Sequence, residues 1–215
     1  MLDELKNAYK LVQYGLKIKA QLGFAILFVL IGIGIEVISK GQVVTGSFYI
    51  ILSGVFIYQL IISVDNSTLV QSSPYKKKIQ CTYPLLATAP WVYMTLAVLS
   101  VIHWIFSRES AEAYGAMCRM TILLGVLLGV LMLYTALAYK YFILATVAMF
   151  VSVFIPIFVL QGENKISIHL NNFGACVAVS FLITTLGVIG CRVLAKITYK
   201  KELDKLAFKA AMKTK

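Results

Sequence analysis

Residues 120–160 read MTILLGVLLGVLMLYTALAYKYFILATVAMFVSVFIPIFVL, an almost continuously apolar stretch in which Lys140 is the one charged residue. A single helix over this stretch would be about 60 Å long, twice the ~30 Å thickness of a bilayer's hydrocarbon core. Tyr139 and Tyr141 flank Lys140, and aromatic and lysine side chains are typical of the headgroup level. The stretch therefore predicts two membrane-spanning helices, 120–139 and 141–160, with a tight turn between them where Lys140 reaches the interface.

The rest of the chain has the same character. Of its 215 residues, 60% are hydrophobic and 13% charged, and the mean hydropathy is +0.86, which a soluble domain with about 25% charged residues does not show. Further apolar runs long enough to cross a bilayer occupy 22–39, 43–64, 85–106 and 173–194. The sequence thus predicts an all-α polytopic membrane protein with six transmembrane helices in a domain over 21–195. Its four cysteines are too scattered for a disulfide framework, and we expect free thiols.

Lysine and arginine accumulate in the cytoplasmic loops of membrane proteins. With the N-terminus inside, sixteen of the twenty basic residues are cytoplasmic, and only Lys40, Arg108, Arg119 and Lys165 lie outside. The pattern predicts a multi-pass protein of the plasma membrane with both termini in the cytoplasm. The net charge of +11 does not indicate nucleic-acid binding, because the basic residues follow the membrane edges instead of sharing one soluble face.

Three segments lie outside the predicted spans. Residues 1–20 place apolar side chains at helical spacing, which predicts an amphipathic interfacial helix, although a plain flank of the first span remains the alternative. Residues 196–215 form a basic cytoplasmic tail with helical spacing that anionic lipid alone would explain. The loop 65–84 is long and basic, and it is either a solvated loop or the carrier of a short helix that contacts a partner. In such a helix Tyr75 and Ile79 would form an apolar stripe beside Lys76, Lys77 and Lys78.

Motifs for chemistry are scarce. The sequence has no phosphate loop, zinc-protease signature or serine elbow, so we expect no catalytic residues, no metal and no cofactor in this chain, and no enzyme activity by itself. His103 and His169 lack a matching carboxylate or cysteine cluster in the sequence. Glu36 is the notable carboxylate within a span, with either a substrate or proton role or an interfacial or ion-paired role. Gly125 and Gly129 form a GxxxG pair, which predicts close helix packing.

Three segments together resemble the permease subunits of type-2 exporters of the ATP-binding cassette superfamily. They are the N-terminal MLDELKNAYKLVQYGLKIKA, the loop STLVQSSPYKKKIQ and the outer connection PIFVLQGENKISIHLNN. In that family they correspond to an interfacial helix, a coupling helix between spans two and three, and a broken helical connection between spans five and six. The resemblance implies an exporter of a hydrophobic or amphipathic substrate that works as two permease copies or paralogues with separate ATPase subunits. ATP and Mg²⁺ would bind to those ATPases, whose closure would push on residues 66–80. The resemblance implies that the ATPase contact is made by Ser72, Ser73, Pro74, Tyr75, Lys76, Lys77, Lys78 and Ile79.

Two other classes of function remain open. A small ion-coupled secondary carrier or channel would make use of Glu36, although no inverted repeat supports it. A non-transporting assembly or immunity subunit would only bind a partner in the membrane.

Overall fold

The computed structural model describes residues 2–15, 17–64, 73–161, 172–202 and 204. Within these ranges the chain is all-α and strand-free, and six of its helices are long and apolar enough to cross a membrane. The fold class predicted from the sequence is confirmed, and the chain is a multi-pass membrane protein. The six are α2 (Ile18–Ile38), α3 (Val44–Val64), α6 (Tyr83–Phe106), α7 (Ala111–Ala138), α8 (Phe142–Gln161) and α9 (Phe173–Thr198).

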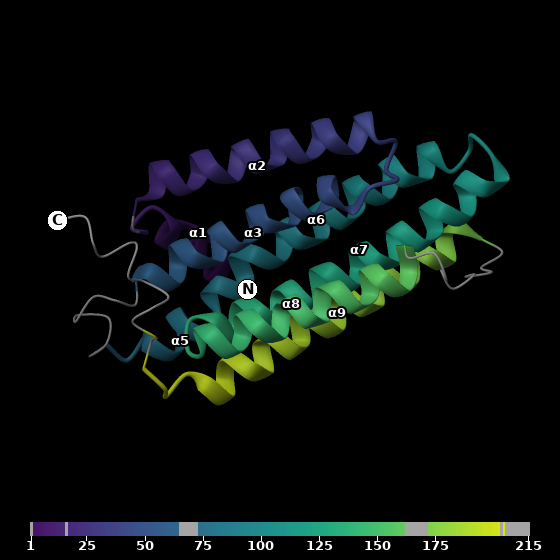
Figure 1. Ribbon diagram of the computed structural model, residues 1–215. Helices are drawn as coiled ribbons and strands as arrows, with labels where there is room; N and C mark the ends of the chain where they lie inside the picture. Colours follow the sequence, from purple (N-terminus) through teal and green to yellow (C-terminus); the bar gives the residue numbers. More distant parts are fainter. Residues whose placement is uncertain (1, 16, 65–72, 162–171, 203, 205–215) are drawn as a thin grey trace.

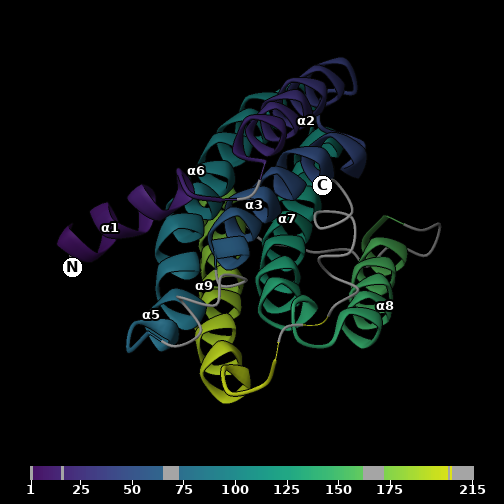
Figure 2. The ribbon, with the colours of Figure 1, turned by 90° about the vertical axis from the view of Figure 1, so that its left-hand side faces the viewer.

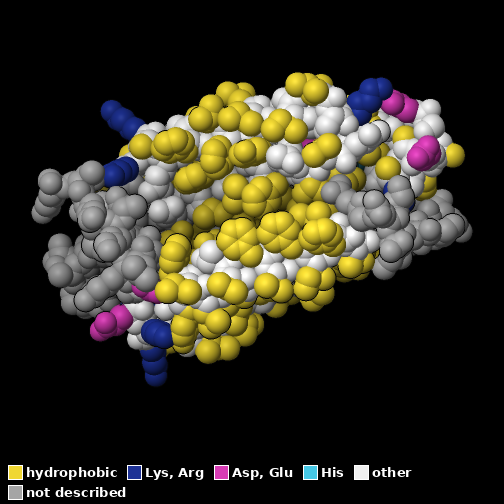
Figure 3. All heavy atoms as spheres, in the orientation of Figure 1, with side chains coloured by type: hydrophobic (Ala, Val, Ile, Leu, Met, Phe, Trp, Pro, Cys, Tyr) yellow, Lys and Arg dark blue, Asp and Glu magenta, His cyan; other side chains and the backbone are white. Residues whose placement is uncertain are grey.

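The six long helices run side by side, and successive ones run in opposite directions (Figure 1). Two shorter helices, α1 (Leu2–Val12) and α5 (Lys76–Cys81), lie at one end of this bundle, and α1 projects from it at an angle (Figure 2). On the face that Figure 3 shows, exposed apolar side chains form a broad band across the middle, and charged side chains lie at the two ends. This distribution matches a bilayer core with an aqueous phase at each end.

Helix α7 is the centre of the bundle. Of its most apolar 18-residue window, 67% is buried, compared with 17% for α2 and 11% for α8, which lie at the edge. The closest packing is between α7 and α9, where a Cβ on Gly125 would lie 2.7 Å from the Cα of Ser180. Gly129 and Gly187 face each other in the same way. Gly125 and Gly129 of α7 therefore allow close packing against α9 within one chain.

Helix ends differ from the sequence boundaries where polar residues continue a helix. The fourth span begins at Ala111, nine residues before the predicted Met120, because the hydroxyl of Ser110 accepts a hydrogen bond of 3.1 Å from the backbone N–H of Ala113 and caps the helix. The amphipathic helix expected over 1–20 ends at Val12, and Lys17 adopts a left-handed conformation (φ 52°) before α2 begins. Hydropathy marks the apolar part of a span and misses such extensions.

The turn predicted at Lys140 is present, with Tyr139 at the C-cap of α7 and α8 beginning at Phe142. Lys140 is 7% exposed, because its side chain is covered by neighbouring parts of the protein. Its Nζ donates hydrogen bonds to Gln80 Oε1 (3.1 Å) and to the backbone carbonyl of Lys201. The connection 162–171, residues 65–72 of the loop before α5 and the tail 205–215 lie outside the described residues.

Candidate functional site

The short helix α5 follows a turn that its own sequence stabilises. The hydroxyl of Ser73 accepts a hydrogen bond from the backbone N–H of Tyr75 (3.1 Å), and the N–H of Lys76 reaches the carbonyl of Ser73 (3.1 Å). Pro74 cannot donate a backbone hydrogen bond and is typical of such a turn. The predicted short helix in this loop is therefore present, although it begins at Lys76 and Ser72 lies outside the described residues.

One face of α5 is fixed against α1 and α6. Ile79 is buried in an apolar cluster with Ala8, Ile61, Tyr83 and Ala87. At the surface above the cluster, Lys78 Nζ lies 3.1 Å from Glu4 Oε1. Exposed ion pairs of this kind contribute at most about 1 kcal/mol, so the apolar cluster is the main connection between α1 and α5.

The other face of α5 contacts the end of α9 and the α7–α8 turn. Cys81 Sγ donates a hydrogen bond of 3.3 Å to the carbonyl of Ala195, and Lys77 Nζ lies 5.4 Å from the centre of the Tyr199 ring. Gln80 accepts the hydrogen bond from Lys140 described above. A displacement of α5 would therefore be transmitted to α1, α6, α9 and the α7–α8 turn together.

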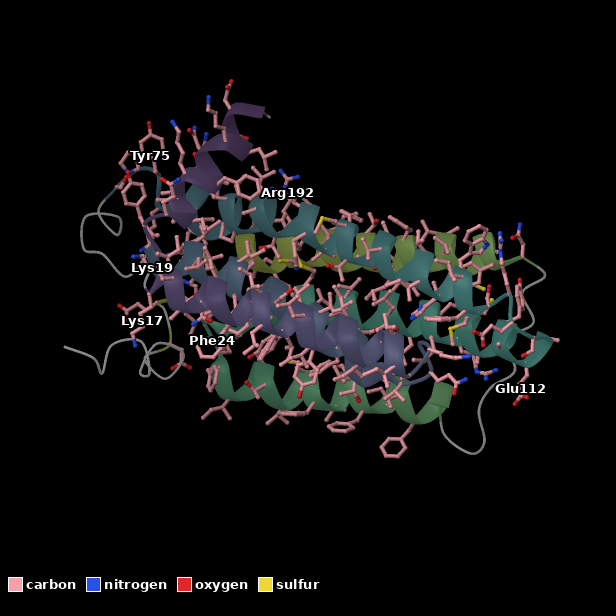
Figure 4. The ribbon with its side chains drawn as sticks, turned by 90° about the horizontal axis from the view of Figure 1, so that it is seen from above. Lys17, Lys19, Phe24, Tyr75, Glu112 and Arg192 are labelled. Carbon is pink, nitrogen blue, oxygen red and sulfur yellow. The ribbon has the colours of Figure 1, made fainter. Side chains whose placement is uncertain are left out.

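The surface that α5 leaves open is basic and aromatic. Tyr75 is 59% exposed, and Pro74, Lys77 and Lys78 are exposed beside it. The expected apolar stripe of Tyr75 and Ile79 is wrong, because the Ile79 side chain points into the protein's own core. Figure 4 shows Tyr75 projecting from the same end of the bundle as Lys17 and Lys19, with Glu112 at the opposite end.

A second polar site lies near that opposite end, buried between four helices. Glu36 of α2 and His103 of α6 are fully buried, and Glu36 Oε1 lies 2.8 Å from His103 Nε2. Ser47 donates a hydrogen bond of 3.1 Å to Glu36 Oε2, and His103 Nδ1 lies 3.1 Å from Thr121 Oγ1. Glu36 is therefore paired with His103 inside the protein and does not reach the interface.

The hydrogen bonds around this pair define how many protons it holds. The hydroxyl of Thr121 donates to the carbonyl of Met117 (2.8 Å), so Thr121 Oγ1 accepts from His103 and Nδ1 carries a proton. A second proton must lie between His103 Nε2 and Glu36 Oε1, because two lone pairs would otherwise face each other at 2.8 Å. With both protons the pair has no net charge, which is the form that a buried site in a membrane tolerates best.

Sequence reasoning missed His103 as the partner of Glu36. Both residues lie within one turn of the same end of their helices, since α2 ends at Ile38 and α6 at Phe106. Equal depth in two spans was a usable signal, but contact also depends on how each helix is rotated about its axis. Gly46 leaves room for the Glu36 carboxylate, because a Cβ at residue 46 would lie 2.6 Å from Glu36 Oε2.

Two of the described cavities are apolar grooves on the lateral surface. One of about 230 Å³ lies between α2, α3 and α6, where Trp91 lines it, and another of about 530 Å³ lies between α6 and α9. Within the described ranges, no group of three histidine, cysteine or acidic residues is placed to hold a metal ion. Comparison with known protein families, curated proteins and solved structures finds no match to this chain.

Proposed function

We propose that the chain is the permease subunit of an ATP-driven ABC exporter and that a separate ATPase subunit acts on α5. The observation that carries this proposal is the position of α5. It follows the second span, presents Tyr75 and lysines to solvent, and is fixed on its inner side to α1, α6, α9 and the α7–α8 turn. A short helix in such contacts has the properties of a lever between a soluble motor and a helix bundle.

The proposed orientation places the end with α1 and α5 in the cytoplasm. The described lysines of α1 and α5, together with Lys17, Lys19 and Lys196, belong to this end, whereas Lys40 and Arg108 belong to the other. This asymmetry follows the positive-inside rule. With six spans the two ends of the described chain are on the same side, which is the side where an ATPase would find its nucleotide.

The proposed substrate is hydrophobic or amphipathic, because the described grooves are lined almost entirely by apolar atoms and open sideways to lipid. The described bundle is packed solidly around α7. We therefore propose that two copies, or this chain and a paralogue, form the transport path between them.

The test is ATP hydrolysis by the complex purified from its native membrane in mild detergent. We expect a P-loop ATPase to co-purify and Tyr75→Ala to reduce substrate-stimulated ATP turnover about tenfold, since truncating an aromatic contact residue at an interface costs about 1–2 kcal/mol or more. Tyr14→Ala is the matched control, because Tyr14 lies at the same end and is 74% exposed but is not part of α5. Equal turnover in the two variants would refute the assignment, and the absence of any ATPase would favour a non-transporting subunit.

The buried pair of Glu36 and His103 favours a second candidate, an ion-coupled carrier. A pair that holds a proton between two side chains in the membrane is a possible proton-binding group for coupled transport. Glu36→Gln distinguishes the two functions, because glutamine can keep the hydrogen bonds but cannot titrate. Loss of proton-driven uptake in this variant supports the carrier, whereas unchanged ATP-driven export supports the exporter.

A further inference from the structure

The larger lateral groove, between α6 and α9, has a shape that favours a single extended chain. Ala97, Ser100 and Trp104 of α6 line it opposite Gly174 and Val177 of α9, and its volume is about 530 Å³. Small side chains at Ala97 and Gly174 leave the space between the two helices open. The groove runs along α9 from Asn172 to Phe181, a distance of about 13 Å at the rise of an α-helix.

The groove is closed towards the middle of the bundle and open towards the end with Glu112. One turn beyond Ala97, the ring of Tyr93 stacks on Phe181 with 6.2 Å between the ring centres, and the Tyr93 hydroxyl lies 3.1 Å from Thr185 Oγ1. These contacts bring α6 and α9 together. On the lipid-facing side Val101 is 54% exposed, so a chain from the surrounding bilayer has direct lateral access.

An unsatisfied polar atom lies in the wall. Ser100 is 5% exposed, and its Oγ has no hydrogen-bond partner within the described part of the chain. A buried hydroxyl without a partner is unfavourable, and membrane spans usually satisfy it through a neighbouring backbone carbonyl. The Ser100 hydroxyl is therefore available to donate to an acceptor on a molecule in the groove.

A cation lies at the open end. The guanidinium carbon of Arg108 lies 3.7 Å from the centre of the Trp104 ring, so the side chain folds back over the groove's rim. The nearest carboxylate along the chain, Glu109, pairs with Lys40 (3.1 Å), and no described carboxylate forms an ion pair with Arg108. The mouth of the groove therefore offers a positive charge to an anion at the interface.

From these features we propose that the groove is a binding site for an anionic phospholipid of the surrounding bilayer. One acyl chain fills the space between α6 and α9, the phosphate lies at Arg108, and the acyl ester accepts the hydrogen bond of Ser100. Ser100 lies one helical turn, a rise of about 6 Å, before Trp104, and the Arg108 guanidinium lies over the Trp104 ring. The headgroup and glycerol of a phospholipid can span a rise of this size. This site does not depend on an ATPase.

The two tryptophans of the chain allow a direct test, because Trp104 lines this groove and Trp91 lines the other. Trp91→Phe leaves Trp104 as the reporter, and Trp104→Phe leaves Trp91. Each variant is reconstituted into vesicles with equal amounts of phosphatidylglycerol and phosphatidylcholine. The acyl chains of one lipid or the other carry bromine, and the quenching of tryptophan fluorescence by the brominated lipid is measured. We expect Trp104 to report about a fivefold preference for phosphatidylglycerol, the factor that corresponds to the ~1 kcal/mol contributed by one basic residue, and Trp91 to report none.

Three further variants, in the background with Trp104 alone, decide the result. Arg108→Gln should abolish the preference, and Ala97→Leu, which fills the groove, should reduce quenching by both lipids. Val98→Leu is the matched control, because Val98 lies beside Ala97 on α6 and is 48% exposed but does not line the groove. Equal quenching of Trp104 by the two lipids, or a preference that survives Arg108→Gln, would overturn the proposal.

Discussion

Glu36→Leu is expected to lower the free energy of unfolding by about 3 kcal/mol, because removal of one partner leaves the other buried and unpaired. His103 would lose its 2.8 Å contact, and Ser47 would lose the acceptor of its 3.1 Å hydrogen bond. The described cysteines are buried and form no disulfide with one another. Their reaction with a thiol-sensitive dye during heating in mild detergent therefore reports unfolding.

Glu36→Gln is the matched control for this prediction. The glutamine amide can donate to His103 Nε2 and accept from Ser47, so the loss should remain below about 1 kcal/mol, the net contribution of an ordinary hydrogen bond. If leucine and glutamine destabilise the protein equally, the hydrogen bonds of Glu36 do not hold α2 against α6. Our interpretation expects the double variant Glu36→Leu/His103→Leu to recover part of the free energy of unfolding that Glu36→Leu loses. A double variant no more stable than Glu36→Leu would contradict it.

Gly125→Ala should destabilise the protein by about 2 kcal/mol, because the added methyl group would meet backbone. Its Cβ would lie 2.7 Å from the Cα of Ser180 and 2.8 Å from the Ser180 carbonyl oxygen, which cannot move without separating α7 from α9. Overpacking of this kind costs about 1–3 kcal/mol. The same dye measurement of unfolding checks the prediction.

Gly34→Ala adds the same methyl group in open space, with no heavy atom of the protein within 4 Å of the Cβ. Alanine is a better helix former than glycine by up to about 1 kcal/mol, so this variant should be as stable as the wild type or more stable. A loss at Gly34 as large as the loss at Gly125 would show that glycine matters for helix flexibility and not for the contact between α7 and α9.

The sequence predicted the spans well, because each is an apolar run whose length is fixed by the bilayer. The turn at Lys140 was predicted from one charge between two tyrosines, and α8 begins within one residue of the expected position. The start of α7 at Ala111 was missed because its first turns, with Glu112 and Arg119, are too polar for a hydropathy window. Capping by Ser110 was the sequence signal for the true boundary.

The sites were harder to predict, since they depend on how helices face one another. The depth of Glu36 in its span left a substrate or proton role and an interfacial or ion-paired role open, and the rotation of α2 places its carboxylate against His103 and away from lipid. For Ile79 the helical spacing was right and the face was wrong, because that side of α5 is buried in the cluster with Ile61 of α3 and with Tyr83 and Ala87 of α6. The groove between α6 and α9 arises from small residues on two helices far apart in sequence, a combination that no single segment displays.

The most direct test of the proposed ATPase contact is photo-crosslinking in the native membrane from position 75. A photoreactive amino acid in place of Tyr75, which is 59% exposed on the open side of α5, should form an adduct with a P-loop ATPase subunit. The same amino acid in place of Glu112, at the opposite end of the bundle (Figure 4), should not form this adduct. An adduct with the ATPase from Glu112, or adducts from Tyr75 that contain no ATPase, would contradict the proposed function.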